Sequence, residues 1–246
     1  MTLEVLPGHY GRDVELDACH HCNVPANLGA RRAQGGVDTE QMFMLARAMQ
    51  TALFGAGSPR IDPSCHRASR IHLGRGAWIE RVPGWLAGHG VVLDQLARTT
   101  CWQHKRRKMY DREVDVPRML AVLPEDGPGH PVLGQVSAVL SARYGQELDR
   151  VALACYRDGR DSVAFHGDRV DERAEHVIIA VLSLGDPRPF QMRPKGGRLA
   201  YSFLSGWGDL LVMGGTCQST WEHAVPKVAR AGLRMSVQFR PGAYAR

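Results

Sequence analysis

Six short apolar runs in the C-terminal half of the chain limit most strongly the folds that it can adopt. Each run is bounded by glycine, aspartate or proline, and in order they read VALACY, HVIIAVLSLG, PFQMRP, RLAYSFLSG, GDLLVMGG and RMSVQFR. Runs of this length and spacing predict a β-sandwich or jelly roll and not alternating βα units. Residues 90–99 and 130–145 have the apolar spacing of helices. We therefore expect a mainly β fold with flanking helices (α+β) around a double-stranded β-helix, or jelly-roll, core.

The first seventy residues differ from the rest of the chain. They mix glycine, arginine, alanine and aspartate, and contain one segment with helical spacing, residues 39–54. We expect residues 1–70 to form an N-terminal extension that is accessory or partly disordered. Residues 71–246 are expected to form the domain that carries the motifs described below.

The bulk composition allows a polyanionic partner and gives no sign of a membrane protein. The 31 lysines and arginines exceed the 25 aspartates and glutamates, so the net charge is +6, which is compatible with nucleic acid but does not require it. No apolar run reaches the length of a signal peptide or of a membrane span. We expect a cytoplasmic monomer without a membrane partner.

The six cysteines are scattered along the chain, which is not the pattern of a small disulfide scaffold. Cys19 and Cys22 have the spacing of half a zinc site, and Cys65 with His66 could complete it. The spacing to that second pair is irregular, so we do not expect a structural zinc. Cys155 and Cys217 lie in or beside core strands and are expected to pack as small apolar residues.

The stretch VAFHGDRV, residues 163–170, carries a histidine and an aspartate two positions apart. On a strand, His166 and Asp168 would point to the same face. His223, in TWEHAVPK, is the best candidate for a third metal ligand, whereas His176 opens an apolar strand and is expected to be structural or exposed. Two histidines and one carboxylate form the facial triad of non-haem Fe(II) oxygenases, which leaves three coordination positions open.

The last run, RMSVQFR, has two distinct faces. Arg234, Ser236, Gln238 and Arg240 alternate with three apolar residues, so the two arginines project from one face. If that face is solvent-exposed, the arginines need no further explanation. If it lines the interior of a barrel, the guanidinium groups need carboxylate partners. A small dicarboxylate that chelates iron at one end and binds an arginine at the other, such as 2-oxoglutarate, would satisfy them.

In this order the motifs resemble those of the AlkB family of Fe(II)/2-oxoglutarate-dependent dioxygenases, of the bacterial type, which repair alkylated nucleic acid. The resemblance runs from about Leu73 to Pro241. It rests on LGRGAWIERVPGWL, MYDREVDVPR, YRDG, HGD, GDLLVMGG, WEH and RMSVQFR. It implies that residues 71–246 form the catalytic domain, that His166, Asp168 and His223 are catalytic iron ligands, and that the cofactors are Fe(II), 2-oxoglutarate and O2.

The resemblance also implies a binding site for the co-substrate. It assigns Tyr156, Arg234 and Arg240 to 2-oxoglutarate, with Ser236 in the place where relatives often carry asparagine. Relatives usually carry a second asparagine where this chain has Ala154. These two departures put the affinity for 2-oxoglutarate in question, while the iron ligands match fully.

The resemblance further implies oxidative dealkylation of bases in DNA or RNA, with release of formaldehyde, succinate and CO2. The partner would be a single-stranded or flipped-out alkylated nucleic acid, because the base must leave the helix to react. The basic run before Asp111 could clamp the backbone beside a stacking platform; alternatively it is a solvated loop. The candidate contacts are Trp102, Arg106, Arg107, Lys108 and Tyr110.

The substrate pocket departs from the family pattern more than the iron site does. Relatives often carry an acidic residue shortly after the iron aspartate, where this chain has Arg169 and Val170. After Pro117 and Arg118, relatives tend to carry aromatic residues, whereas this chain reads MLAVL. Two alternatives therefore remain: a hydroxylase or demethylase of a protein or small molecule with the same cofactors, and a non-enzymatic module that kept the fold.

Overall fold

The computed structural model describes residues 57–109, 112–124, 129–168 and 176–242, and the side chains of residues 104–115 are outside that description. The helix expected at 39–54, Cys19 and Cys22 are also outside it. No helix in the described ranges is long and apolar enough to cross a bilayer.

The helices and short strands that flank the core are β1 (Arg60–Ile61), β4 (Leu86–Ala87), α2 (His89–Thr99), α3 (Pro131–Tyr144) and α4 (Cys217–Thr220). The strands of the two main sheets are β2 (Ser69–Gly74), β3 (Ala77–Val82), β5 (Gln103–Met109), β6 (Arg112–Val122), β7 (Arg150–Tyr156), β8 (Val163–His166), β9 (Ile179–Gly185), β10 (Arg188–Pro194), β11 (Tyr201–Ser205), β12 (Asp209–Gly214), β13 (Trp221–Val225) and β14 (Arg234–Arg240).

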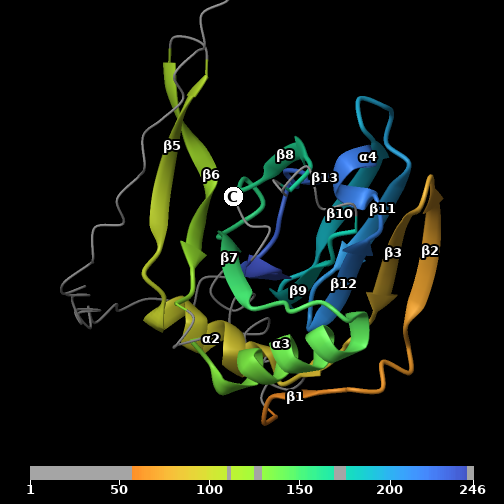
Figure 1. The fold of residues 1–246 in the computed structure, drawn as a ribbon. Helices are drawn as coiled ribbons and strands as arrows, with labels where there is room; N and C mark the ends of the chain where they lie inside the picture. The colour runs from red at the N-terminus through yellow and green to blue at the C-terminus, as the bar shows by residue number, and fades with distance from the viewer. Residues whose placement is uncertain (1–56, 110–111, 125–128, 169–175, 243–246) are drawn as a thin grey trace, which may run out of the picture. The chain divides into compact units, whose positions relative to one another are not determined.

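Two antiparallel sheets form the core (Figure 1). The larger has eight strands in the order β2-β3-β12-β9-β14-β7-β6-β5, and the smaller has four in the order β11-β10-β13-β8. Neighbours within each sheet often lie far apart in sequence, as in a jelly roll. The expected mainly β fold with flanking helices is confirmed.

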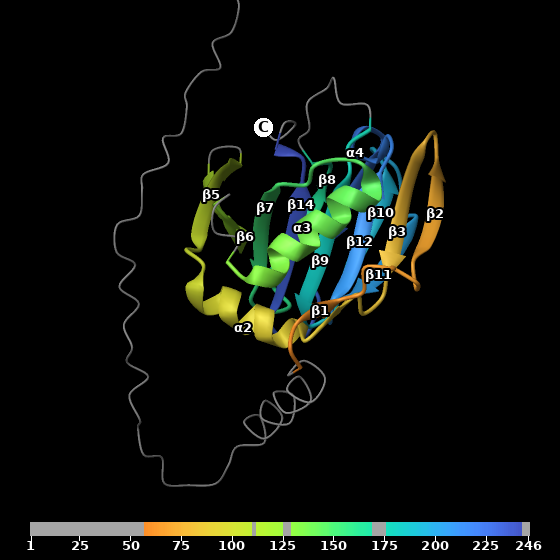
Figure 2. The ribbon, with the colours of Figure 1, turned by 60° about the horizontal axis from the view of Figure 1, so that its bottom comes forward.

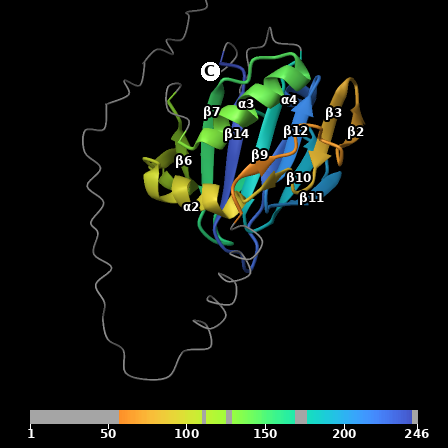
Figure 3. The ribbon, with the colours of Figure 1, turned by 90° about the horizontal axis from the view of Figure 1, so that it is seen from below.

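Strand β9 shows how the sequence builds two apolar layers. All seven of its residues are buried, because one face of the strand meets helices and the other meets the smaller sheet. Leu182 and Leu184 belong to the layer shared with α2 and α3, while Ile179 and Val181 belong to the layer between the sheets. Figures 2 and 3 show α3 lying along the outer face of the larger sheet, and α2 beside it.

Local signals in the sequence set the ends of α3. The His130 side chain accepts a hydrogen bond from the Val132 backbone N–H, and Pro131 occupies the first turn, where its missing N–H costs nothing. Gly145 ends the helix with φ of 66°, a conformation that glycine adopts without strain. The helix therefore lies close to the bounds that its spacing predicts.

Strand β14 has the two faces that its alternation predicts. Its apolar residues, Met235, Val237 and Phe239, are fully buried against the helix layer. On the other face Arg234 is 0% exposed and Ser236 is 3% exposed, so that face lines the interior between the sheets. Of the two readings of the arginine face, the buried one is correct.

Two elements differ from the sequence expectation. The basic run is not a solvated loop but strand β5, which pairs with β6 as a hairpin at the edge of the larger sheet. Strand β8 ends at His166, so Asp168 lies beyond the strand. Some residues before 70 also take part in the fold, because β1 pairs with β4 and Cys65 is buried in the helix-side layer. The division of the chain at residue 70 stays a prediction.

Candidate metal centre

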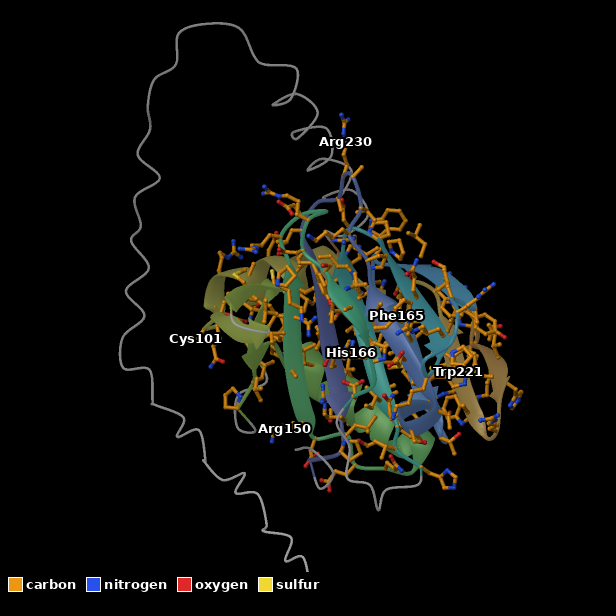
Figure 4. All side chains as sticks on the ribbon, turned by 90° about the horizontal axis from the view of Figure 1, so that it is seen from above. Cys101, Arg150, Phe165, His166, Trp221 and Arg230 are labelled. Carbon is orange, nitrogen blue, oxygen red and sulfur yellow. The ribbon has the colours of Figure 1, made fainter. Side chains whose placement is uncertain are left out.

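Three side chains that could bind a metal ion converge between the sheets. His166 ends β8, His223 lies on β13, and the two residues are directly opposed in the antiparallel register. Their rings lie 4.4 Å apart between centroids, and Nε2 of His223 is 3.7 Å from Oδ2 of Asp168. One ligand atom from each of the three residues lies within 4.8 Å of the others. Figure 4 labels His166 near the middle of the view.

The turn after β8 brings Asp168 back toward the histidines. The Asp168 backbone N–H donates to Oε1 of Gln218, on the short helix α4, at 3.1 Å. Between the two ligands, a Cβ at Gly167 would lie only 2.8 Å from the Gln218 carbonyl oxygen. The glycine of the HGD motif is therefore required by close packing of the turn against α4.

The surroundings fix the donor atom of His166. Its Nδ1 lies 2.9 Å from the Ala164 carbonyl oxygen. Because a carbonyl can only accept, Nδ1 carries the proton, and the lone pair is on Nε2. A backbone partner of this kind is the usual way in which a metal-binding imidazole is oriented.

His223 is held in the neutral form that a metal ligand requires. Its ring is stacked on Phe190, 5.2 Å away between centroids with an angle of 14° between the planes. Burial lowers the pKa of His223 to about 4, and the Asp168 carboxylate only partly opposes this. At neutral pH the imidazole therefore offers a free lone pair.

Arg234 is a buried cation without a counter-ion. It donates to the hydroxyls of Ser236, at 2.7 Å, and Ser183, at 3.0 Å, and its guanidinium lies 5.1 Å from the centre of the Tyr156 ring. Its Nε is buried without a hydrogen-bond partner, and no carboxylate of the described residues is within ion-pair distance. Burial lowers the pKa of Arg234. An anionic ligand would satisfy this group.

Arg240 shares the face of Arg234 but has different neighbours. Its Nη2 donates to Oε1 of Gln238 at 2.6 Å and lies 3.6 Å from Oδ1 of Asp168. The second arginine of the strand therefore touches the carboxylate of the metal cluster, an outer-shell contact that orients a ligand.

One pocket connects these groups. Besides His166, Asp168 and His223, it is lined by Arg118, Tyr156, Phe190, Ser236, Gln238 and three valines. Two residues of this lining contact Arg234: Ser236 accepts a hydrogen bond from it, and the Tyr156 ring makes a cation–π contact with it. The two imidazoles and the carboxylate suit an iron ion. The buried guanidinium, which has no anionic partner among the described residues, suits one end of a dicarboxylate.

Most of the predicted nucleic-acid contacts are not among the side chains that the structure describes at this site. Trp102 is half-buried and packs against the helix-side layer, as a structural residue would. Arg106, Arg107 and Lys108 lie on β5, where only the backbone is described, and Tyr110 lies outside the described residues. Their role stays a prediction.

Several residues of the site had no signal of their own in the sequence. Gln218 follows from no motif, and Ser183 is a single hydroxyl within an apolar run. Arg188 is 0% exposed, and its guanidinium lies 5.8 Å from the centre of the Tyr156 ring, but it donates to the backbone carbonyls of residues 158, 159, 161 and 226. Arg188 therefore has a structural role: it holds these backbone segments together. Gln238 could have been found from its place in the β14 alternation.

A jelly roll with a two-histidine, one-carboxylate cluster in its interior defines the class of non-haem, Fe(II)- and 2-oxoglutarate-dependent dioxygenases. The sequence matches the profile described as the 2OG-Fe(II) oxygenase superfamily over residues 79–240. The chain belongs to that superfamily, whose cofactors are Fe(II), 2-oxoglutarate and O2, so the cofactor prediction is confirmed.

Individual relatives confirm the resemblance to the AlkB family. The chain is 29% identical over 157 residues to "Alpha-ketoglutarate-dependent dioxygenase alkB homolog 3" of Homo sapiens, which covers 55% of each chain. It is 30% identical over 122 residues to "DNA oxidative demethylase ALKBH2" of Bos taurus, over 46% of this chain and 44% of that protein. The chain thus spans about half the length of the curated relatives that it matches. These relatives do not test the bacterial type.

Among solved structures, the one titled "The structure of OsALKBH1" has the same fold. It superposes with a TM-score of 0.51 and 13% sequence identity, over 70% of this chain and all of that one. At this identity the similarity supports the fold alone.

Proposed function

We propose that this protein removes N-methyl groups from alkylated bases in DNA or RNA by oxidation, as a repair reaction. One observation carries the proposal: the pocket that His166, Asp168 and His223 line is also lined by Tyr156 and Ser236, which contact the buried cation Arg234. A site for iron therefore adjoins a site for the distal carboxylate of 2-oxoglutarate. Two relatives with AlkB-homologue names support the nucleic-acid substrate.

In this proposal the three clustered residues bind Fe(II), and Tyr156, Ser236 and Arg234 hold 2-oxoglutarate. When bound, iron and 2-oxoglutarate supply the oxidation of a methyl group by O2. Each methyl group leaves as formaldehyde, and each 2-oxoglutarate becomes succinate and CO2. The protein contributes position and exclusion of water, because the strong oxidation belongs to the cofactor.

The protein's own groups prepare the site before any substrate arrives. The Ala164 carbonyl orients His166, and the Phe190 ring fixes His223. Arg240 holds the Asp168 carboxylate from the β14 side. Pre-oriented ligands of this kind bind a metal ion without further rearrangement.

The β5–β6 hairpin supports a nucleic-acid substrate. Its β6 strand carries Arg118 into the pocket, while β5 carries the basic run of residues 104–108. A basic strand beside an active site can bind the phosphate backbone and leave one base free to enter the pocket.

The test is the release of formaldehyde from N-methylated single-stranded DNA in the presence of Fe(II), 2-oxoglutarate and ascorbate, with succinate followed in parallel. His166→Ala is expected to release none, and His72→Ala, which changes an exposed histidine of β2, is expected to match the wild type. Succinate without formaldehyde would retain the dioxygenase and reject methylated DNA as its substrate.

A second candidate is a hydroxylase or demethylase of a protein or small molecule. It is favoured by residues 119–122 of β6, which carry no aromatic side chain, and whose Met119 and Leu120 pack against the two apolar layers. Stronger binding of methylated than of unmethylated single strands would argue against it.

A further inference from the structure

Arg118 is the one charged residue of the described pocket lining that has no partner. It lies on β6, and its guanidinium borders the same pocket as the three clustered metal-binding side chains. Its Nε is buried without a hydrogen-bond partner among the described residues.

The described lining offers no negative charge to an incoming base. Its only carboxylate is Asp168, which belongs to the metal cluster and has Arg240 at 3.6 Å. Apart from the metal site, the charge that the described lining presents to a substrate is therefore that of Arg118.

Methylated bases fall into two chemical groups with respect to such a charge. Methylation at N1 of adenine or N3 of cytosine produces a cation at neutral pH, whereas methylation at N3 of thymine or N1 of guanine produces a neutral base. In the neutral group a carbonyl oxygen flanks the methylated nitrogen of an uncharged ring; 3-methylcytosine also has a carbonyl oxygen beside N3, but its ring is cationic. A guanidinium donates to carbonyl oxygens and repels a cation.

We propose that Arg118 determines substrate specificity, and that it makes the pocket select neutral, carbonyl-bearing N-methyl bases over cationic ones. The proposal rests on the proposed nucleic-acid function and narrows its substrate class. Arg118 recognises the base by donating to the oxygen beside the methylated nitrogen. A hydrogen bond from a charged donor, gained with one group and lost with the other, corresponds to a preference of roughly 10- to 100-fold.

Equilibrium binding tests this without turnover. The full-length protein is loaded with Mn(II) and 2-oxoglutarate and titrated with fluorescent single strands that carry one central 3-methylthymine, 1-methyladenine or unmodified thymine. The wild type is expected to bind 3-methylthymine about 10-fold or more tightly than 1-methyladenine. Formaldehyde release with iron should follow the same order.

Three variants test whether Arg118 causes this preference. Arg118→Gln is expected to remove most of the preference, and Arg118→Glu to reverse it. Arg98→Gln, which changes an exposed arginine in the last turn of α2, is expected to leave it unchanged. Retained Mn(II) binding and an unchanged melting temperature show that each variant is folded.

Other outcomes overturn the proposal in distinguishable ways. A wild type that releases formaldehyde but prefers 1-methyladenine keeps the proposed function and rejects this specificity. If that preference disappears in an Asp171→Asn, Glu172→Gln double variant, acidic residues after Asp168, and not Arg118, recognise the charge of the base. An unchanged preference in Arg118→Glu also rejects the role of Arg118. No preference for any methylated strand, with no formaldehyde, rejects the nucleic-acid function itself.

Discussion

Replacing Arg234 by methionine should affect stability and co-substrate binding in opposite directions. The arginine is 0% exposed, donates to two serine hydroxyls, and has no carboxylate partner in the described part of the chain. Replacing a buried charged group by an apolar side chain of similar size is often neutral or stabilising, here by about 1 kcal/mol. Ser183 keeps its bond to Ser205, at 2.9 Å. We therefore expect the free energy of unfolding without ligand to stay the same or rise.

The same substitution should weaken 2-oxoglutarate binding strongly. Losing a charged hydrogen-bonding partner for a carboxylate costs about 2–3 kcal/mol, or a roughly 30- to 150-fold weaker Kd. At a ligand concentration of 100 times the wild-type Kd, the wild type gains about 2.7 kcal/mol of stability. A variant with a 100-fold weaker Kd gains only about 0.4 kcal/mol under the same conditions.

The assay is denaturant unfolding with and without 2-oxoglutarate in the presence of Mn(II), together with calorimetric titration. Arg188→Met is the matched control, because Arg188 is also 0% exposed but donates to four backbone carbonyls. Removing it leaves these acceptors unsatisfied and should cost about 3–5 kcal/mol. If Arg234→Met destabilises the ligand-free protein as much as Arg188→Met and keeps the wild-type Kd, Arg234 is structural and the reasoning is refuted.

Three further substitutions test the metal centre and the hairpin. His166→Ala should abolish stoichiometric Fe(II) or Mn(II) binding, as measured by metal content, whereas His72→Ala should bind like the wild type. Gly167→Ala places a Cβ 2.8 Å from the Gln218 carbonyl oxygen, so the turn that carries Asp168 must move. This movement should lower metal affinity by about 10- to 100-fold. An unchanged metal titration would show that the turn can shift without disturbing the ligands. Changing the three basic residues 106–108 to alanine should make the slope of log K against log salt for single strands shallower by about 2, because each lost phosphate contact contributes about 0.7 to the slope. An unchanged slope would show that the hairpin does not contact the nucleic acid.

The sequence was most informative where burial alternates along a strand. In β14, the period-two alternation predicted that the apolar residues lie on one face and the arginines on the other, because successive side chains of a strand point to opposite faces whichever sheet it joins. The metal cluster was predicted for a related reason: two of its members are two residues apart, and the third is one of few histidines beside a core strand. Strand β5 was missed because its basic run has no apolar alternation, and only pairing with β6 makes it a strand.

The different surroundings of the two arginines could not have been predicted from β14 alone. Arg234 lies opposite Tyr156 on one neighbouring strand and Gly185 on the other, and it bonds to Ser183, 51 residues earlier in the chain. Arg240, six residues on, passes beyond the paired end of β9 and faces the turn that carries Asp168. One strand therefore places one cation, Arg234, in the buried interior beside two serine hydroxyls, and the other, Arg240, beside the metal cluster. That division is set by the register between strands distant in sequence. In a shifted register, the same Arg-x5-Arg spacing would leave the Asp168 carboxylate, and in the proposed function also the co-substrate, without an arginine partner.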